Sequence, residues 1–556
     1  MKKIFTLLLI LASLSVLSQN SYFDDAREIY FVFNIDSRAE IEMLSKVVDI
    51  DNVGGDLSVK AYASEKQFNE FLDLNYNYSV LEHPGRLIKN PRMLDKVNIR
   101  EITDWDFYPT YEAYMDMMQQ FVDDYPELCE IHHIAYTYEE REIITVKISD
   151  NVGEEESEPE FFYTATMHGD ETAGYVISLR LIDYLLSNYG TDPRITNMVN
   201  EIEIFINPLA NPDGTYATGN NSVYGATRNN SQGVNLNRNY PDPEDGPHPD
   251  GKPWQLETLG FMEFAENHHI VMSCNMHGGA EVCNYPWDTW QHLHADDDWW
   301  VFVCREYADT VHAYSNNYMT GFNNGITNGY AWYTIAGGRQ DYMTYFQQGR
   351  EFTLEMSNTK LLPASQLPAH WEYNYRSLLN YMEQVLYGVR GTIINDSSGE
   401  PIRAEVFILD HEEDSSWIYS DLPHGNYSKV IYEGTYDIRF DAPGYFAQVF
   451  EDVEVNNYSS LFLDVSLVPQ FSGIEDKDAS SVKIYPNPVA SNYFQVSSGA
   501  GINRITLVDI SGKLLMDRTY NSEKRIFMDA SALPGNVYFL NVYFDGEVES
   551  RKLIVK

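Results

Sequence analysis

Two short segments place a histidine directly after an apolar run that is typical of a buried strand. His168 and Glu171 follow the run 161–167, and His277 ends the run 271–276 and precedes two glycines. Imidazole and carboxylate are the ligands that zinc takes in hydrolases, where a fourth position stays open for water. A lone His-x-x-Glu pair is more commonly a surface pair, but two matching strand-end His-Gly loops are much less expected by chance. We therefore predict that these three residues bind zinc.

Between the two histidine segments, polar residues carry groups suited to holding a chain end. Arg228 lies in a stretch without helical periodicity, and Asn237 and Arg238 lie in the segment 233–241. A guanidinium pairs with a carboxylate through two parallel N–H donors, which suits it to gripping a free carboxyl terminus. A surface salt bridge is the usual role of an arbitrary Arg. The long turn-rich connection that precedes these residues favours a binding role, because long loops in compact domains tend to be functional.

A single carboxylate interrupts the apolar strand pattern of residues 352–356. Glu355 stands in the middle of this pattern, and a buried carboxylate without a partner is costly. Two interpretations remain open from this segment alone. Either Glu355 faces solvent from an edge strand, or it lies beside a metal and acts as general base and then general acid.

With these motifs in place, residues 105–387 resemble the zinc carboxypeptidases of the pancreatic and regulatory type, and more closely the regulatory, carboxypeptidase N/E/D-like branch. The segments 277–288 and 328–342 are similar to the signatures of that branch. The resemblance implies an α/β fold, a mixed twisted sheet of about eight strands with helices on both faces and the site at strand ends. It also implies one Zn²⁺ per catalytic domain and hydrolysis of the C-terminal peptide bond of peptides or proteins with a free C-terminus.

The same resemblance assigns roles to individual residues by motif. The zinc ligands would be the three residues named above, and Glu355 would be the base that activates water at the metal. Arg228 would polarise the scissile carbonyl and stabilise the oxyanion. The terminal carboxylate would be held by Asn237, Arg238 and Tyr333.

Specificity and metal affinity depend on four further positions of the resemblance. Asp288 matches an acidic residue in the pocket for the terminal side chain, and Gln340 matches a polar neighbour, so terminal Lys or Arg is favoured. Arg339 stands where the branch usually has Met, and a cation near the pocket would oppose that preference. Asn235 replaces the usual Asp that orients the first zinc histidine. An amide accepts the same hydrogen bond without a charge, so we expect lower metal affinity or rate.

The first 82 residues contain two predicted segments. Residues 1–18 combine Lys2 and Lys3 with an apolar run too short to span a bilayer, which is typical of a signal peptide. No other segment is apolar enough for a membrane helix. Residues 26–82 form a small α/β domain that resembles the segments preceding many bacterial enzymes of this type, and an inhibitory propeptide and a permanent packing domain remain alternatives. Its predicted elements are strand 29–35, helix 39–48, strand 57–63, helix 65–74 and strand 78–81.

Two β domains are predicted after the catalytic domain. Residues 388–468 show short strands of alternating polarity, which favours a β-sandwich and resembles the transthyretin-like domain of regulatory carboxypeptidases. A polar linker leads to residues 482–556, another β-sandwich in our prediction. Their motifs resemble the C-terminal sorting domain of the type IX secretion system. The resemblance implies that this machinery exports the protein through the periplasm. The protein would then be secreted or held at the cell surface.

Composition excludes some classes of partner. The chain has 556 residues, with 83 Asp and Glu against 38 Lys and Arg and a net charge of −45, which argues against binding nucleic acid or anionic membranes. Four cysteines are too few for a disulfide framework, so one bridge and buried free thiols remain alternatives. Two other functions also remain open: a zinc amidase or peptidase acting on cell-wall peptides, and a catalytically inert surface protein that binds peptides.

Overall fold

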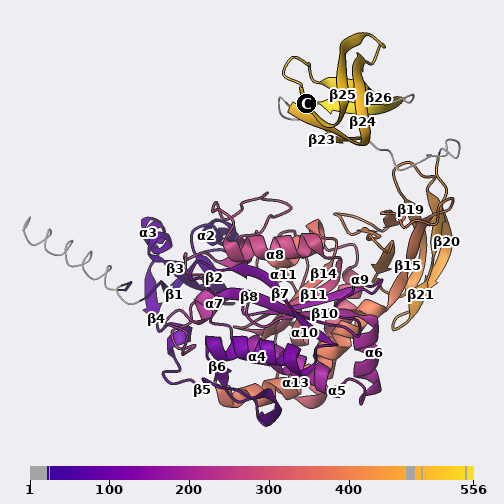
Figure 1. Ribbon diagram of the computed structural model, residues 1–556. Coiled ribbons are helices and arrows are strands. Elements are labelled where there is room, and N and C mark those ends of the chain that lie inside the picture. Colours follow the sequence, from indigo (N-terminus) through magenta and orange to yellow (C-terminus); the bar gives the residue numbers. More distant parts are fainter. Residues whose placement is uncertain (1–21, 24–25, 471–481, 490–492, 545–547) are drawn as a thin grey trace, which may run out of the picture. The chain divides into compact units, whose positions relative to one another are not determined.

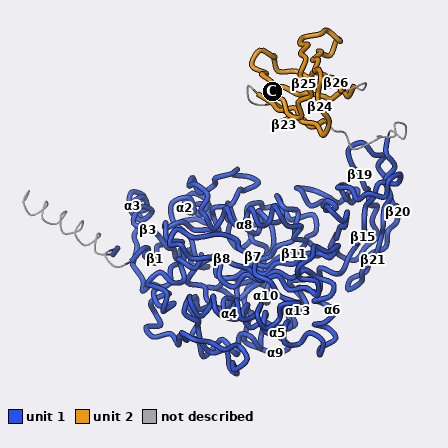
Figure 2. The backbone as a smooth tube through the Cα atoms, viewed as in Figure 1, with its two compact units in different colours: residues 1–470 blue, residues 471–556 orange. Residues whose placement is uncertain are grey.

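The computed structural model describes residues 22–23, 26–470, 482–489, 493–544 and 548–556 (Figure 1). The predicted signal peptide, residues 1–18, lies outside the described residues. The chain divides into two compact units, residues 1–470 and 471–556 (Figure 2).

The N-terminal domain (residues 26–82) is an antiparallel sheet in the order β2-β3-β1-β4. Alternation along β1 sends Ile29, Phe31 and Phe33 into a core shared with α3, and leaves Glu28 and Tyr30 on the opposite face. Strands β1, β3 and β4 agree with the three predicted strands, whereas β2 was not predicted, and α2 is shorter than the predicted helix 39–48. The elements are β1 (Glu28–Asn34), α2 (Ile41–Ser45), β2 (Asp49–Val53), β3 (Ser58–Ser64), α3 (Glu65–Asp73) and β4 (Tyr78–Leu81).

The central domain (residues 105–387) is built on the mixed eight-stranded sheet that the sequence predicted, in the order β13-β12-β14-β11-β9-β10-β8-β7. Strand β11 pairs in parallel with both β14 and β9, so the carboxyl ends of these three strands meet at one edge. The strands are β7 (Cys129–Tyr136), β8 (Glu142–Ile148), β9 (Glu160–Ala165), β10 (Glu203–Asn207), β11 (Ile270–His277), β12 (Glu281–Tyr285), β13 (Ile326–Asn328) and β14 (Arg350–Met356).

Helices cover both faces of this sheet (Figure 1). Helix α8 (Leu256–Asn267) packs on one face through Phe261 and Phe264, against Phe162 and Phe205 of the strands. The larger core lies on the other face. It is covered by α4 (Tyr111–Asp124), α5 (Ala173–Asn188), α6 (Pro193–Glu201), α9 (Asp297–Tyr314) and α13 (Leu367–Glu383).

Residues 388–470 form two small sheets that enclose a common core. One sheet has the order β18-β15-β21, with β22 also pairing with β15, and the other has the order β17-β16-β19-β20. This arrangement agrees with the predicted β-sandwich. The strands are β15 (Gly388–Asn395), β16 (Glu405–Ile408), β17 (Ile418–Tyr419), β18 (Asn426–Lys429), β19 (Gly434–Asp441), β20 (Gln448–Val455), β21 (Ser460–Phe462) and β22 (Val465–Leu467).

A buried charge network joins the central domain to the β-sandwich. Asp296, just before α9, accepts hydrogen bonds from Arg350 Nε at 3.0 Å and Nη2 at 2.6 Å. Lys429 of β18 lies 3.5 Å from the same carboxylate oxygen. Both Arg350 and Lys429 also donate to the Ser416 carbonyl, at 2.7 and 2.9 Å. The network fixes the β-sandwich against the site-bearing sheet.

The second unit is all-β, as expected. Its described strands join in one five-stranded sheet in the order β23-β24-β26-β27, with β25 pairing with β24. Register shifts interrupt the pairing of β24 with β25. The strands are β23 (Val482–Tyr485), β24 (Tyr493–Asp509), β25 (Leu514–Asp529), β26 (Asn536–Tyr543) and β27 (Val548–Val555).

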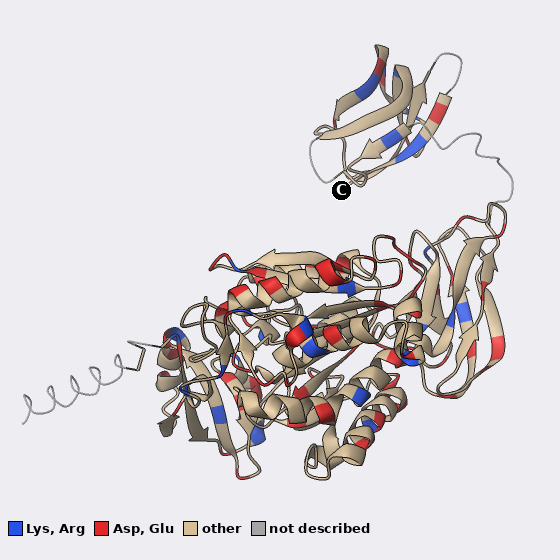
Figure 3. Cartoon of the chain, turned by 60° about the horizontal axis from the view of Figure 1, so that its bottom comes forward, with Lys and Arg blue, Asp and Glu red and all other residues tan. Residues whose placement is uncertain are grey.

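The fold bears on two expectations for the chain as a whole. All four cysteines, at 129, 274, 283 and 304, are buried free thiols, which decides between the two alternatives. None of the helices in the described residues is long and apolar enough to cross a bilayer. Acidic positions occur on helices, strands and loops of the first unit (Figure 3).

Candidate metal centre and catalytic site

The ends of two adjacent parallel strands bring the predicted metal ligands together. His168 and Glu171 lie in the loop between β9 and α5, and His277 is the last residue of β11. Gly169 allows the loop to fold tightly, because a Cβ there would lie 2.3 Å from the Gly214 backbone. The loop and the strand end therefore present their side chains to one point.

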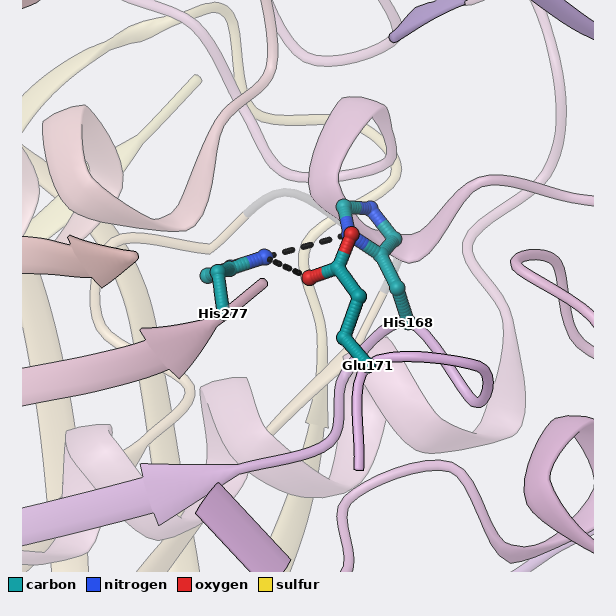
Figure 4. Close-up of side chains that lie close together, drawn as sticks. All are labelled: His168, Glu171 and His277. Atoms are coloured by element: carbon teal, nitrogen blue, oxygen red, sulfur yellow. Dashed lines mark hydrogen bonds and ion pairs between the residues drawn. The ribbon is translucent and has the colours of Figure 1, made fainter. Parts of the chain in front are cut away.

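These three side chains form a compact donor set (Figure 4). His277 Nδ1 lies 3.1 Å from His168 Nδ1 and 2.8 Å from Glu171 Oε2, and His168 Nδ1 lies 2.9 Å from Glu171 Oε1. Ligand atoms at zinc distances around a tetrahedral ion are about 3.3 Å apart. The donor types and their separations both fit zinc.

Burial and neighbours give these groups the protonation states that a metal requires. Burial holds the pKa of His168 well below its ordinary value and lowers the pKa of His277, so both rings are neutral. Burial opposes ionisation of Glu171, but His168, Lys360 and His277 hold its pKa well below the usual range. His168 Nε2 lies 3.0 Å from Asn235 Oδ1, the orienting contact expected of that amide.

Glu355 lies next to the metal centre on a neighbouring strand. Strand β14 runs between β11 and β12, and Glu355 is paired in register with His277. Because β14 is an interior strand, the edge-strand interpretation of Glu355 is wrong. Burial and the nearby Glu171 carboxylate raise the pKa of Glu355 to about 8. Its Oε2 is buried and has no hydrogen-bond partner among the described residues.

The predicted carboxylate-binding residues neighbour the metal ligands and one another. Arg228 Nη1 donates to Glu171 Oε1 at 2.9 Å and interacts electrostatically with Tyr333. Arg238 interacts in turn with Tyr333, Arg228 and Asp288. Arg238 Nη1 donates to the Asn237 carbonyl at 2.7 Å, whereas its buried Nη2 finds no partner among the described residues. A buried guanidinium nitrogen without a partner is suited to a carboxylate ligand.

Asp288 and Gln340 are both buried, at 1 % exposed. Asp288 lies close to Asn237, because a Cβ at Gly338 would be 3.5 Å from Asp288 Oδ2 and 3.7 Å from Asn237 Oδ1. Asn284 Nδ2 donates to Asp288 Oδ1 at 3.1 Å. A Cβ at Gly329 would lie 1.8 Å from that oxygen, so glycine leaves room for the carboxylate. Burial raises the pKa of Asp288 to about 6. Gln340 Oε1 accepts from the Thr353 amide at 2.8 Å, and its Nε2 has no partner in the described part of the chain.

The expectation that Arg339 opposes Asp288 is wrong. The Arg339 side chain is 1 % exposed and its Nη2 lies 3.2 Å from Glu351 Oε2. Its guanidinium also lies 5.2 Å from the ring centroids of Phe162 and Phe261. The charge is neutralised inside the core between the sheet and α8 and does not reach the pocket.

Sequence reasoning missed the residues that the N-terminal domain adds to the site. The Glu28 carboxylate accepts from the backbone amides of Arg228 at 2.5 Å and of Asn229 at 3.2 Å. Asp51 Oδ1 lies 2.6 Å from Lys360 Nζ, and Lys360 Nζ lies 2.6 Å from Glu171 Oε1. No local motif marks these contacts, because they join segments that are far apart in the sequence.

The N-terminal domain covers the site closely. His168, Glu171 and His277 are each 2 % exposed, and Tyr333 is 9 % exposed. Tyr333 and Ile335 belong to the same hydrophobic cluster as the core of the N-terminal domain. The N-terminal domain therefore packs directly against residues of the site.

Comparison with known proteins agrees with this geometry. Residues 114–377 match the family model described as zinc carboxypeptidase, and residues 483–556 match the secretion system C-terminal sorting domain. Carboxypeptidase M of Mus musculus is 34% identical over 359 residues, which cover 61% of this chain and 79% of that relative. The chain belongs to the zinc carboxypeptidase family.

Other members of the family show how far the similarity extends. Carboxypeptidase D of Mus musculus is 33% identical over 379 residues, which cover 65% of this chain. The matched part is 27% of that relative's length, so the similarity to carboxypeptidase D is partial. The crystal structure of carboxypeptidase A from Helicoverpa armigera has a TM-score of 0.50 at 16% identity, covers 64% of this chain and 97% of its own, and supports the fold.

Proposed function

We propose that this protein is a secreted zinc-dependent carboxypeptidase that hydrolyses the C-terminal peptide bond of peptides and proteins. One observation carries the proposal: a buried His-Glu-His donor set has Glu355 in register beside His277. The unpartnered donor of Arg238 lies further along the same site and supports an action at chain ends. Family membership makes the same chemistry the expected one.

Each residue of the site has its own role in the proposed reaction. His168, Glu171 and His277 would hold zinc, which would supply a Lewis acid and lower the pKa of water to about 7. Glu355 takes a proton from the attacking water and then gives a proton to the leaving amine. The Arg228 guanidinium stabilises the negative charge that develops on the carbonyl oxygen.

Recognition of the terminus falls to the other end of the site. Arg238 Nη2 pairs with the terminal carboxylate, and Asn237 and Tyr333 add polar contacts. Asp288, with Gln340 beside it, then takes the side chain of the last residue and favours Lys or Arg. Burial of Arg339 against Glu351 supports this preference, because no cation opposes Asp288.

The N-terminal domain acts as an inhibitory, propeptide-like domain in this proposal. Its polar face reaches the site through Glu28 and Asp51, and the metal ligands beneath it are almost fully buried. The segment that follows exposes three basic residues, Lys89, Arg92 and Lys96. A trypsin-like protease that cuts there would separate the domain from the catalytic domain.

The remaining segments serve export and support. Residues 1–18 act as a signal peptide, and residues 482–556 as the type IX sorting signal, which leads to secretion or display at the cell surface. The β-sandwich 388–468 is a transthyretin-like domain that supports the catalytic domain. The buried network around Asp296 favours this supporting role.

Hydrolysis of matched short peptides tests the proposal. Peptides that end in Arg, Lys, Leu, Phe or Glu would be incubated with the purified chain before and after mild trypsin treatment, with and without a zinc chelator. We expect chelator-sensitive release of Arg and Lys that rises after trypsin treatment. No release from any peptide by the treated, zinc-loaded protein would contradict the proposal. Release of Leu, Phe or Glu instead would keep the chemistry but contradict the assigned role of Asp288.

A further inference from the structure

Lys360 is a buried cation at the metal end of the site, and the roles proposed above leave it unassigned. It lies in the loop after β14, and its Nζ is 2.6 Å from Glu171 Oε1 and 2.6 Å from Asp51 Oδ1. Its side chain is 8 % exposed. A Cβ at Gly279 would lie 2.7 Å from Lys360 Cε and Nζ, so glycine at that position makes space for the ammonium group.

The carboxylate that faces Lys360 belongs to another domain. Asp51 lies in β2, at the register shift between Ile50 and Asn52 where β2 pairs with β3. A β-bulge of this kind redirects a side chain. Tyr30 donates to the second Asp51 oxygen at 2.8 Å and holds the carboxylate in place. Lys360 is therefore positioned to hold a carboxylate that comes from outside the catalytic domain.

Lys360 lies beside the metal ligands together with Arg228. Lys360 Nζ and Arg228 Nη1 both contact Glu171 Oε1, at 2.6 and 2.9 Å. Both also lie near Asp51 Oδ1, at 2.6 and 3.8 Å. In the proposed function, the scissile carbonyl lies at Arg228 and the last residue of the substrate fills the pocket of Asp288. The preceding residue then lies on the opposite side of the scissile bond from that pocket, where Lys360 is the unassigned cation.

We propose that Lys360 is a specificity-determining residue that binds an acidic side chain in the residue immediately before the scissile bond. Asp51 occupies this position when the N-terminal domain is docked. The inference rests on the proposed carboxypeptidase function and deepens it by naming a substrate class: peptides with Asp or Glu followed by the terminal residue. The net charge of −45 repels acidic peptides, so a preference for them requires a local cation.

A purely structural role makes a different prediction. If Lys360 only balances the charge of Glu171, its replacement changes turnover of all peptides alike. If Lys360 binds substrate, its replacement changes the ratio between peptides that differ in the penultimate residue. This ratio is independent of the fraction of molecules with a displaced N-terminal domain, because both peptides compete for the same open form.

The experiment measures kcat/KM of the full chain on three peptides that end in Asp-Arg, Ala-Arg and Lys-Arg. We expect the Asp peptide to exceed the Lys peptide by about tenfold or more, mainly through KM. Lys360→Met should bring this ratio close to one, Lys360→Arg should retain it, and Lys360→Glu should reverse it. Lys66→Met removes a charge from an exposed side chain and serves as the control.

The outcomes separate the two levels of the proposal. Hydrolysis with equal rates for the three peptides, or a ratio that survives in Lys360→Met, would overturn the role of Lys360 and leave the carboxypeptidase function standing. The same series in the Asp51→Asn chain covers the case of a tightly closed wild type. Failure of the trypsin-treated, zinc-loaded wild type to hydrolyse any of the peptides would overturn the function itself, and the role of Lys360 with it.

Discussion

The metal end and the pocket end of the site differ in how their buried cations are paired. At the metal end, Lys360 is paired with Glu171 and Asp51, and Arg228 is paired with Glu171. At the pocket end, Arg238 forms no salt bridge with a described residue. Its Nη1 donates to a backbone carbonyl, and its buried Nη2 has no hydrogen-bond partner among the described residues.

This difference indicates which buried cations are neutralised within the chain and which one is left for a ligand to neutralise. A buried cation without a counter-charge is costly, so Arg238 indicates a place where an anionic ligand completes the contacts. At the metal end, Asp51 of the N-terminal domain already supplies a counter-charge. In the proposed function, substrate therefore replaces Asp51 at one end and pairs with Arg238 at the other.

The largest expected effect is at the metal end. Glu355→Gln removes the proton-accepting carboxylate but no ligand, so we expect kcat to fall about a hundred- to ten-thousandfold while zinc stays bound. Turnover and zinc content of the purified variant would be measured together. His277→Ala is the matched comparison and should lose both. Turnover of Glu355→Gln near the wild-type rate would disprove the assigned base.

The next effect sharpens the assignment of the pocket end. Arg238→Ala leaves the terminal carboxylate without its charged partner, which corresponds to a KM about ten- to a hundredfold higher for peptides with a free terminus. Amidation of the peptide terminus should slow the wild type in a similar way and add little to the variant. Additive losses in the variant and the amidated peptide would show that Arg238 binds something else.

A smaller, pH-dependent effect is expected at Asp288. Its carboxylate attracts a terminal cation only when ionised, and burial raises its pKa to about 6. The preference for terminal Arg over Leu in kcat/KM should therefore be present above pH 6 and fade as the pH falls below it. Asp288→Ala should abolish the preference, about tenfold, at every pH. A preference that strengthens below pH 6 would exclude this carboxylate as the determinant.

The smallest effect concerns the partner that the N-terminal domain supplies. Asp51→Asn removes one charge from the contact with Lys360 but keeps the Glu28 contacts and the shared hydrophobic cluster. We expect the activity of the full chain to rise only a few-fold, by about 1 kcal/mol of lost docking energy, because the Asn amide oxygen still accepts a hydrogen bond from Lys360. Initial rates of untreated and trypsin-treated protein would be compared. Equal activity before and after trypsin in the wild type would contradict closure by this domain.

The parts of the site that lie in local motifs could be predicted from the sequence. His168, Glu171 and His277 stand directly after or at the end of buried strands, and the structure brings them within metal-binding distance. The eight-stranded sheet follows from the same apolar runs. The segment around Glu355 left open whether this residue lies on an edge strand or beside a metal. Its position on the interior strand β14 decides this, because strand order is a property of the whole sheet.

The parts that depend on distant partners could not be predicted. Strand β2 has the sequence Asp-Ile-Asp-Asn-Val, whose polar residues interrupt the alternation expected of a strand. Asp51 lies at the register shift of this strand. Arg339 resembled a pocket residue by position, but Glu351 draws its side chain into the core. The local sequence does not indicate that Asp51 contacts Lys360 or that Arg339 contacts Glu351. Tertiary packing determines both contacts.

The charge network around Asp296 makes the catalytic domain inseparable from the β-sandwich that follows it. A chain that stops at Tyr387 would retain Asp296 and Arg350 but lose Lys429 and the Ser416 carbonyl. Removing one partner from a buried ionic group typically costs about 3–5 kcal/mol, a large fraction of the stability of a domain. The catalytic domain and the β-sandwich should therefore be moved together when the protein is recombined or engineered.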